Sequence, residues 1–311
     1  MKKSCILGSG SWAHALSTVF SNNDYIVKCR DINKASLTFK SKVQLVERFT
    51  LLNDSEYIFL AIPSQSLRKN LIDLKKETSF KKFVFVICNK GVEKKTNKLM
   101  SEVILDIFPN NKVVVLSGPN FSSELIAGKP SASVIASTDK KISKKVASLL
   151  SPNKFRIYFN NDIVGTQLGG AMKNVIAIAC GLIKGKNLGE NAKAAIITRG
   201  ISEIVQLGMK MGAKRNTFYG LSGIGDLTLT CSSMKSRNTR FGFHIAKGRK
   251  LEDFKENYVL EGVDSCDSIC NLGEKYNVEL PLCNSIRKII NGMELEKVIS
   301  NLLSRPLQNE N

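Results

Sequence analysis

The chain has 311 residues, of which 43% are hydrophobic and 23% charged, as in a globular protein large enough for two cores. Its formal net charge of +19 would suit a nucleic acid, an anionic membrane surface or an anionic small ligand. The basic residues are spread along the whole sequence, without a run of five and without metal-finger spacing. We therefore expect no specific nucleic-acid partner and no metal site.

The eight cysteines lie mostly in apolar runs, and none forms a C-x-x-C pair. This usage is typical of a reducing compartment, so we expect a cytoplasmic protein whose cysteines are small core residues. The apolar part of the N-terminus is too short for a signal peptide. Because only His14 and His244 are available, acid–base chemistry must fall mainly on Lys, Asp, Glu or Tyr.

A dinucleotide-binding pattern opens the chain. Residues 5–7 are predicted to form a short buried strand, G-x-G-x-x-A follows at Gly8, Gly10 and Ala13, and a helical pattern comes next. The glycines permit a tight turn, and the helix N-terminus offers backbone N–H groups to a pyrophosphate. We predict a nucleotide cofactor here; the alternative is a glycine-rich turn without a ligand.

The second predicted strand, residues 25–29, is followed by two residues that bear on the choice of cofactor. An acid at this place holds the ribose of NAD, whereas an arginine accommodates the extra phosphate of NADP. Arg30 and Asp31 together leave the choice open. If the side chains alternate as in a strand, Asp31 points away and caps the next helix, so NADP bound by Arg30 is slightly favoured over NAD.

Continuous apolar strands are predicted at 57–62, 83–87, 113–116, 132–136 and 155–159, with helices at 64–76 and 94–108. Such runs alternating with helices predict a parallel sheet covered on both faces, with ligands at the carboxyl ends of the strands. Lys90, in the turn 89–91 after one strand, is either a surface residue or a cation that reaches into a cleft. The neighbouring Gly91 favours the second interpretation.

After residue 162 the pattern becomes helical. Residues 163–183 could span a membrane by length, but Gln167, Lys173 and Asn174 would be costly in lipid, so we expect a buried helix and no membrane insertion. Further helices are predicted at 190–211, 236–247, 260–276 and 282–303. The predicted fold class is therefore α/β, with a Rossmann-type doubly wound sheet in domain 1–160 and an all-helical domain at 161–311.

Lys173 is the most informative single residue. Lysine is seldom buried without a partner, so one in an apolar helix either extends to the surface or is placed for chemistry. Burial lowers the pKa of a lysine and makes it a usable general acid or base. The scarcity of histidine favours chemistry, with Asp226 as a plausible counter-charge.

The stretch 221–238 concentrates small, polar and charged residues. Gly223 and Gly225 precede Asp226, and Ser236, Arg237 and Asn238 end the stretch. An arginine flanked by short hydrogen-bonding side chains suits a phosphate. The alternative is a glycine-rich turn, a helix N-cap at Ser236 and a solvated arginine.

These motifs, taken in order, resemble the bacterial NAD(P)-dependent glycerol-3-phosphate dehydrogenases over nearly the full chain. The matching segments are GSGSW at 8–12, NKG at 89–91, SGPNF at 117–121, QLGGAMKNVIAIA at 167–179, LSGIGDLTLTC at 221–231, SRN at 236–238, EG at 261–262 and ELP at 279–281. The resemblance implies hydride transfer between NAD(P)H and dihydroxyacetone phosphate. The product, sn-glycerol 3-phosphate, would supply phospholipid synthesis.

The resemblance also implies roles for individual residues. Lys173 would be the catalytic proton donor and acceptor, oriented by Asp226. The small phosphorylated substrate would contact Lys90, Gly118, Asn120, Lys173, Asp226, Ser236, Arg237 and Asn238. The cofactor would contact Gly8, Gly10, Ser11, Trp12, Arg30, Lys90, Ser122, Arg237, Val259 and Glu261.

The chain departs from the family pattern in three places. His14 stands where threonine is common, and Asn120 and Ser122 replace the usual Ser or Thr and Ala. Only 25 residues separate Asp31 from Tyr57, fewer than is usual. These departures keep one alternative open, an inactive or altered-substrate NAD(P)-binding member of the same fold. A homodimer is also left open.

Overall fold

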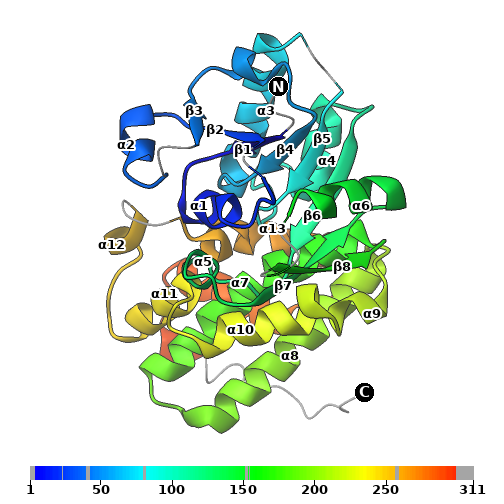
Figure 1. Cartoon of the computed structure of the whole chain (residues 1–311). Coiled ribbons are helices and arrows are strands. Elements are labelled where there is room, and N and C mark those ends of the chain that lie inside the picture. The colour runs from blue at the N-terminus through cyan, green and yellow to red at the C-terminus, as the bar shows by residue number, and fades with distance from the viewer. Residues whose placement is uncertain are drawn as a thin grey trace.

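The computed structural model describes residues 4–22, 24–39, 43–79, 82–150, 153, 155–255 and 259–298. Figure 1 shows a sheet with its covering helices above and a group of packed helices below. We call the residues up to Asn160 the sheet half and those from Ile163 the helical half. That the two halves are separate domains, divided at 160/161, stays a prediction.

The sheet half is built on one eight-stranded sheet in the described part of the chain, with the order β3-β2-β1-β4-β5-β6-β7-β8. Its order reverses between β1 and β4, which are parallel neighbours with Leu7 opposite Leu60. The strands are β1 Ser4–Leu7, β2 Tyr25–Lys28, β3 Gln44–Val46, β4 Tyr57–Leu60, β5 Val84–Ile87, β6 Lys112–Ser117, β7 Ser131–Ala136 and β8 Phe155–Asn160.

Alternate residues of the strands enter two different cores. Leu7, Leu60 and Ile87 pack with α3 and α4 on one face, while their neighbours Ile6 and Phe59 pack with α1, α5 and α6 on the other. Burial on both faces explains the continuous apolar runs and confirms the doubly wound prediction. The helices of this half are α1 Ser11–Ser17, α2 Ile32–Ser36, α3 Leu67–Glu77, α4 Met100–Ile107, α5 Ser122–Ile126 and α6 Lys140–Ser148.

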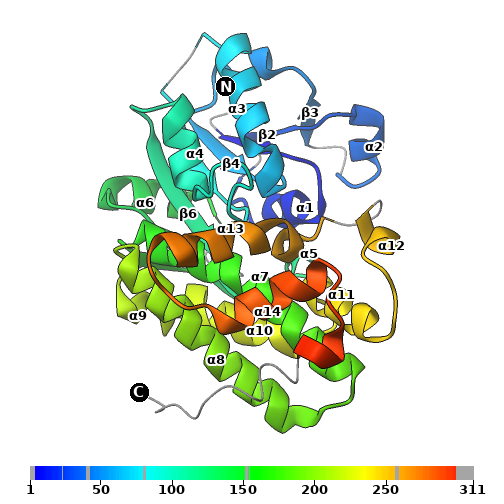
Figure 2. The ribbon, with the colours of Figure 1, turned by 180° about the vertical axis from the view of Figure 1, so that it is seen from behind.

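The helical half is arranged around one buried helix, α7. Figure 2 shows α13 and α14 in front of α7, whereas Figure 1 shows α10 and α11 on the near side. The helices are α7 Ile163–Gly185, α8 Gly189–Lys210, α9 Arg215–Phe218, α10 Asp226–Ser232, α11 Arg237–Ala246, α12 Glu252–Lys255, α13 Glu261–Lys275 and α14 Pro281–Ile290, with a π-helical turn at Leu221–Gly225 before α10.

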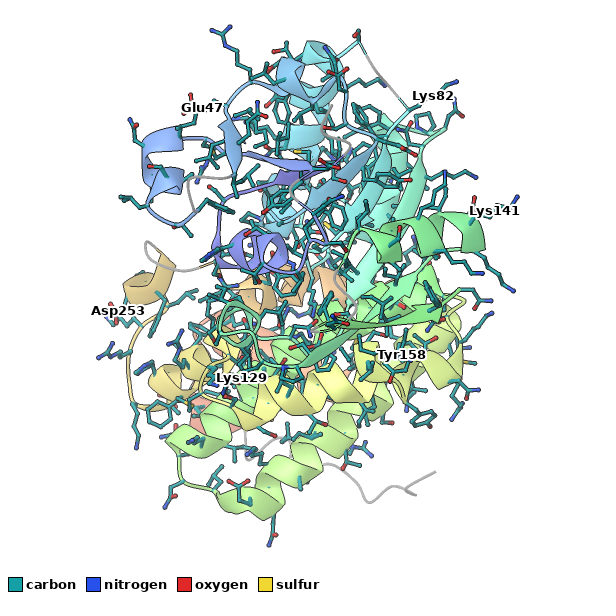
Figure 3. The ribbon with its side chains drawn as sticks, viewed as in Figure 1. Glu47, Lys82, Lys129, Lys141, Tyr158 and Asp253 are labelled. Carbon is teal, nitrogen blue, oxygen red and sulfur yellow. The ribbon has the colours of Figure 1, made fainter. Side chains whose placement is uncertain are left out.

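Helix α7 is long and apolar enough to cross a membrane by length and composition, yet 89% of its apolar window is buried inside the molecule. It is thus the core helix that the sequence predicted. All eight cysteines are also buried and unbridged, as expected of small core residues. Charged side chains such as Glu47, Lys82, Lys141 and Asp253 lie at the outer surface in Figure 3, in keeping with a dispersed surface charge.

The structure differs from the sequence prediction at several elements. Strand β7 runs antiparallel to β6, because the connection between them holds only the short α5, which cannot carry the chain back along the sheet. The helix predicted at 94–108 begins only at Met100, after a turn with Asn97 in the left-handed region. The helix predicted at 282–303 is interrupted after Ile290, residues 295–298 are helical again, and residues 299–303 lie outside the described residues.

Candidate active site

A cavity of about 300 Å³ lies between the two halves at the carboxyl ends of β1, β4, β5 and β6. This is the place where parallel sheets with a reversal in strand order bind ligands. The residues that line it come from both halves: Gly10, Ser11, Trp12, Ala61, Ile62, Pro63, Cys88, Asn89, Lys90, Asn120, Phe121, Ser122, Lys173, Asn174, Thr230, Lys235, Ser236, Arg237, Asn238, Val259 and Glu261.

One buried carboxylate, Asp226, lies beneath the cavity wall and joins two lysines that line the cavity. Lys173 Nζ donates to Asp226 Oδ1 at 2.5 Å, and Lys90 Nζ donates to Asp226 Oδ2 at 2.6 Å. Asp226 is fully buried and therefore has no contact with solvent. The predicted pairing of Lys173 with Asp226 is confirmed, and Lys90 reaches into the cleft rather than to the outer surface.

Close packing of helices brings Lys173 and Asp226 together. A Cβ at Gly169 would lie 2.6 Å from the carbonyl oxygen of Ser222, so only glycine lets α7 approach the turn Leu221–Gly225 this closely. Helix α10 begins after that turn with Asp226, and Thr230 follows one helical turn later on the same side. Thr230 Oγ1 accepts a second hydrogen bond from Lys173 Nζ at 2.8 Å.

Burial lowers the pKa of Lys173 to about 8, and the positive charge of Lys90 acts in the same direction. The carboxylate of Asp226 opposes this effect by stabilising the ammonium form. Lys173 therefore carries its proton at neutral pH and can release it at little cost. This is the property required of a general acid and base.

The segment Ser236–Asn238, which the sequence predicted to bind a phosphate, lies at the N-terminus of α11. Ser236 caps this helix by accepting a hydrogen bond from Thr239 N at 3.2 Å, and Arg237 starts the helix with its side chain on the cavity. The two interpretations of this stretch are therefore compatible, because the capping residue and the cavity-lining arginine are neighbours. The preceding stretch is helical rather than a loop, since α10 packs against α7.

A relay of amide hydrogen bonds ties this segment to the lysines. Gly262 N donates to Asn238 Oδ1 at 3.2 Å, Asn238 Nδ2 donates to Asn174 Oδ1 at 3.1 Å, and Asn174 Nδ2 donates to Lys90 O at 3.1 Å. We call these three bonds the amide relay. It links α13, α11, α7 and the turn after β5, and it therefore fixes the backbone of Lys90 relative to the helical half.

The first turn of the chain fits a dinucleotide. Gly8 has φ +118°, and a Cβ there would lie 2.5 Å from the carbonyl oxygen of Ala61, so the turn requires glycine. Gly10 precedes α1, and a Cβ on it would meet nothing within 4 Å. The space in front of this helix N-terminus is therefore open to an anionic group such as a pyrophosphate.

Buried polar atoms beside this space also call for a ligand. Both amide atoms of Asn89, which lines the cavity, have no hydrogen-bond partner among the described residues. Leaving such atoms unpaired is costly, so they are suited to a polar ligand that supplies donors and acceptors. The residues present therefore fit a nicotinamide dinucleotide.

Glu261 connects the two halves beside the cavity. Its Oε1 accepts a hydrogen bond from Ser64 N at 2.9 Å, whereas Oε2 packs against Gly91. Burial raises the pKa of Glu261 to about 7, although the positive charge of Arg237 and the Ser64 N–H act in the opposite direction. Glu261 is therefore a carboxylate whose charge changes near neutral pH.

Some residues predicted from the sequence do not line the cavity. Gly8 lies behind it, Gly118 contributes its carbonyl to Lys90 Nζ at 2.9 Å, and Arg30 is exposed after β2. Asp31 caps α2 by accepting from Lys34 N at 2.9 Å, as strand alternation predicted. Asn120 lines the cavity, but its amide is bonded to Ala132 O and Ser133 Oγ. The ligand contacts of all these residues stay predictions.

The sequence prediction missed several lining residues, among them Asn89, Asn174, Thr230 and Lys235. Two of them carried a signal, because Asn174 adjoins Lys173 and Thr230 lies four residues after Asp226. Lys235 directly precedes the Ser236–Asn238 motif. Asn89 stands in the turn beside Lys90, but nothing in the sequence shows which way its amide points.

Comparison with known proteins bears on the whole chain. Residues 3–143 match the family model described as NAD-dependent glycerol-3-phosphate dehydrogenase N-terminus, and residues 162–300 match that of the C-terminus. A Clostridium perfringens protein named glycerol-3-phosphate dehydrogenase (NAD(P)+) is 37% identical over 331 residues, which cover 100% of this chain and 99% of the relative. A Corynebacterium glutamicum protein of the same name is 40% identical, with 96% and 97% covered.

Solved structures agree in fold. A crystal structure of glycerol-3-phosphate dehydrogenase from Coxiella burnetii superposes with a TM-score of 0.91 at 29% identity, covering 97% of this chain and 98% of that one. The likeness thus extends over both halves and over the cavity between them.

Proposed function

Because the chain belongs to the NAD-dependent glycerol-3-phosphate dehydrogenase family, we propose that it interconverts dihydroxyacetone phosphate and sn-glycerol 3-phosphate with NAD(P)H. The observation that carries this proposal is the buried Lys173–Asp226–Lys90 cluster at the base of a cavity suited to a dinucleotide. Reduction of a ketone needs a proton at oxygen while hydride reaches carbon, and this cluster can deliver that proton.

In the reducing direction, Lys173 Nζ gives its proton to the carbonyl oxygen of the substrate, and the C=O bond becomes a C–OH bond. NAD(P)H, held by Gly10, Ser11 and Trp12, would supply the hydride that the carbonyl carbon requires and would be oxidised to NAD(P)+. Lys90 adds positive charge near the developing alkoxide, which electrostatically lowers the barrier. Asp226 holds both ammonium groups in place, and Lys173 regains its proton from solvent. In the oxidising direction, neutral Lys173 removes the hydroxyl proton.

The phosphate of the substrate is assigned to Ser236, Arg237 and Asn238 at the N-terminus of α11, where the backbone N–H groups and a guanidinium both favour an anion. The cofactor is assigned to Gly10, Ser11 and Trp12 for the pyrophosphate, with Ser122, Val259 and Glu261 along the same cavity. NAD and NADP both remain candidates, and Arg30 favours NADP. The unbridged cysteines support a reducing compartment such as the cytoplasm.

The test is turnover by the purified protein. Addition of dihydroxyacetone phosphate should oxidise NADPH or NADH, measured by the loss of absorbance of the reduced cofactor. The alternative, an inactive or altered-substrate member, predicts cofactor binding in a titration without oxidation. An absence of turnover with either cofactor between pH 6 and pH 9 would reject the proposed reaction.

The wider role and the assembly are proposals that rest on the family. Glycerol 3-phosphate made by this enzyme would enter phospholipid synthesis. A strain that lacks the gene should therefore need added glycerol 3-phosphate for growth. A homodimer is tested by light scattering of the purified protein.

A further inference from the structure

One cation on the cavity wall has no part in the chemistry proposed above. Lys235 directly precedes the Ser236–Asn238 segment and lines the cavity. Its Nζ donates to Glu124 Oε1 at 2.6 Å, and Glu124 belongs to α5 of the sheet half. This ion pair therefore joins the two walls next to the segment that is proposed to bind the phosphate.

The charges that line the cavity are unevenly distributed. Lys90 and Lys173 are both held by Asp226 at the base, which fixes their positions. Arg237 at the other end interacts electrostatically with Glu261, and Lys235 is the remaining cation among the described lining residues. A phosphate monoester carries about −1.5 to −2 charges at neutral pH. Arg237 alone therefore leaves the phosphate under-compensated.

The contact between Lys235 and Glu124 is easily exchanged. The side chains are 51% and 32% exposed, and ion pairs in such surroundings contribute little to stability. Lysine is a point charge on a flexible stem, so it can change partners without backbone movement. A doubly charged phosphate at the start of α11 would attract Lys235 more strongly than the single charge of Glu124.

We propose that Lys235 leaves Glu124 and binds the phosphate of the substrate as a second cation beside Arg237, which makes Lys235 a determinant of specificity for phosphorylated substrates. The proposal rests on the proposed function and adds a residue outside the resemblance-based assignments. Glu124 then acts as the resting partner that keeps the ammonium group at the mouth of the cavity.

The first test is Lys235→Ala. A charge-assisted contact of this kind changes affinity by about tenfold, so the KM for dihydroxyacetone phosphate should rise by about that factor while kcat falls less than twofold. The kcat/KM for unphosphorylated dihydroxyacetone should change less than twofold, and Lys235→Arg should restore most of the affinity. Lys144→Ala, which removes the same charge from the exposed surface of α6, is the matched control.

The second test is Glu124→Gln, which releases Lys235 without removing it. The KM for dihydroxyacetone phosphate should fall by about two- to threefold, because the lysine no longer exchanges partners. An unchanged or higher KM in this variant would contradict the proposal that Lys235 leaves Glu124 to bind the phosphate. Equal losses for the phosphorylated and unphosphorylated substrates in Lys235→Ala would overturn the role in specificity. Absence of turnover in the unaltered protein would instead reject the proposed function.

Discussion

The two halves of the molecule contribute different kinds of groups to the cavity. The sheet half supplies backbone turns and small residues, such as Gly10 and Ser11, at the ends of its strands. The helical half supplies buried charged and amide side chains, such as Lys173 and Asp226, from the middle or the first turn of helices. In the proposed mechanism, the sheet half would bind the cofactor mainly through its backbone and add only the charge of Lys90, while Lys173 of the helical half would move the proton.

The largest effect is expected from removal of Lys173, which changes only the helical half of the cavity. Lys173→Ala should lower kcat by about 10²- to 10⁴-fold, since general acid catalysis typically contributes a factor of this size. Cofactor affinity, measured by titration of the reduced cofactor's fluorescence, should change little because the sheet wall is intact. Retention of more than half the activity would show that Lys173 serves only in packing.

The next effect concerns the phosphate end of the helical wall. Arg237→Ala should raise the KM for dihydroxyacetone phosphate and also lower kcat, with a combined loss in kcat/KM of about 10- to 100-fold. Binding energy from the remote phosphate helps to align the reacting carbon. Unphosphorylated dihydroxyacetone is the control substrate. If it suffered as badly as the phosphate ester, Arg237 would not be the phosphate ligand.

The contribution of the sheet half is tested by the affinity for the cofactor. Arg30→Ala should weaken NADPH binding about tenfold to a hundredfold and leave NADH nearly unchanged, because only NADPH has a 2′-phosphate for the guanidinium. The measurement is the dissociation constant of each reduced cofactor. Equal effects on both cofactors, or a preference of the unaltered protein for NADH, would contradict the assignment of Arg30.

The smallest effect is expected on the free energy of unfolding. It concerns Glu261, which joins the two halves through its hydrogen bond with Ser64 N. Its pKa is raised from 4.5 to about 7 in the folded state, so ionisation is penalised by folding. That penalty is absent below pH 4.5, grows as the pH rises toward 7, and stays constant above. Glu261→Gln should therefore stabilise the protein by about 1–2 kcal/mol at pH 8 and by roughly a quarter of that at pH 5. Urea unfolding at both pH values measures this difference; equal changes would contradict it.

The sheet was predictable because its signal is local. Strands such as Tyr57–Leu60 are apolar at every position since both faces are covered, and this pattern needs no knowledge of the neighbours. Strand β3 was missed because it has three residues at the sheet edge and only Val46 is fully buried. Helix α10 was missed because Thr228 and Thr230 have low helix propensity, and packing against α7 overrides it.

The site was predictable only in part. Lys173 stood out as a charge inside an apolar helix, and its pairing with Asp226 follows from the need for a counter-charge. The second bond of Asp226, to Lys90, joins residues 136 positions apart, and no local pattern carries such a contact. Lys235 was overlooked for a similar reason, since its place on the cavity wall depends on the packing of α5 against the helical half.

The amide relay has a direction, because every bond in it runs from donor to acceptor in the order Gly262, Asn238, Asn174, Lys90. Loss of an amide nitrogen through deamidation would turn a donor into an acceptor and set two oxygens against each other. Damage of this kind at Asn174 would free the backbone of Lys90 while leaving every helix in place. A protein changed in this way would lose the hydrogen bond that ties α7 to the turn after β5.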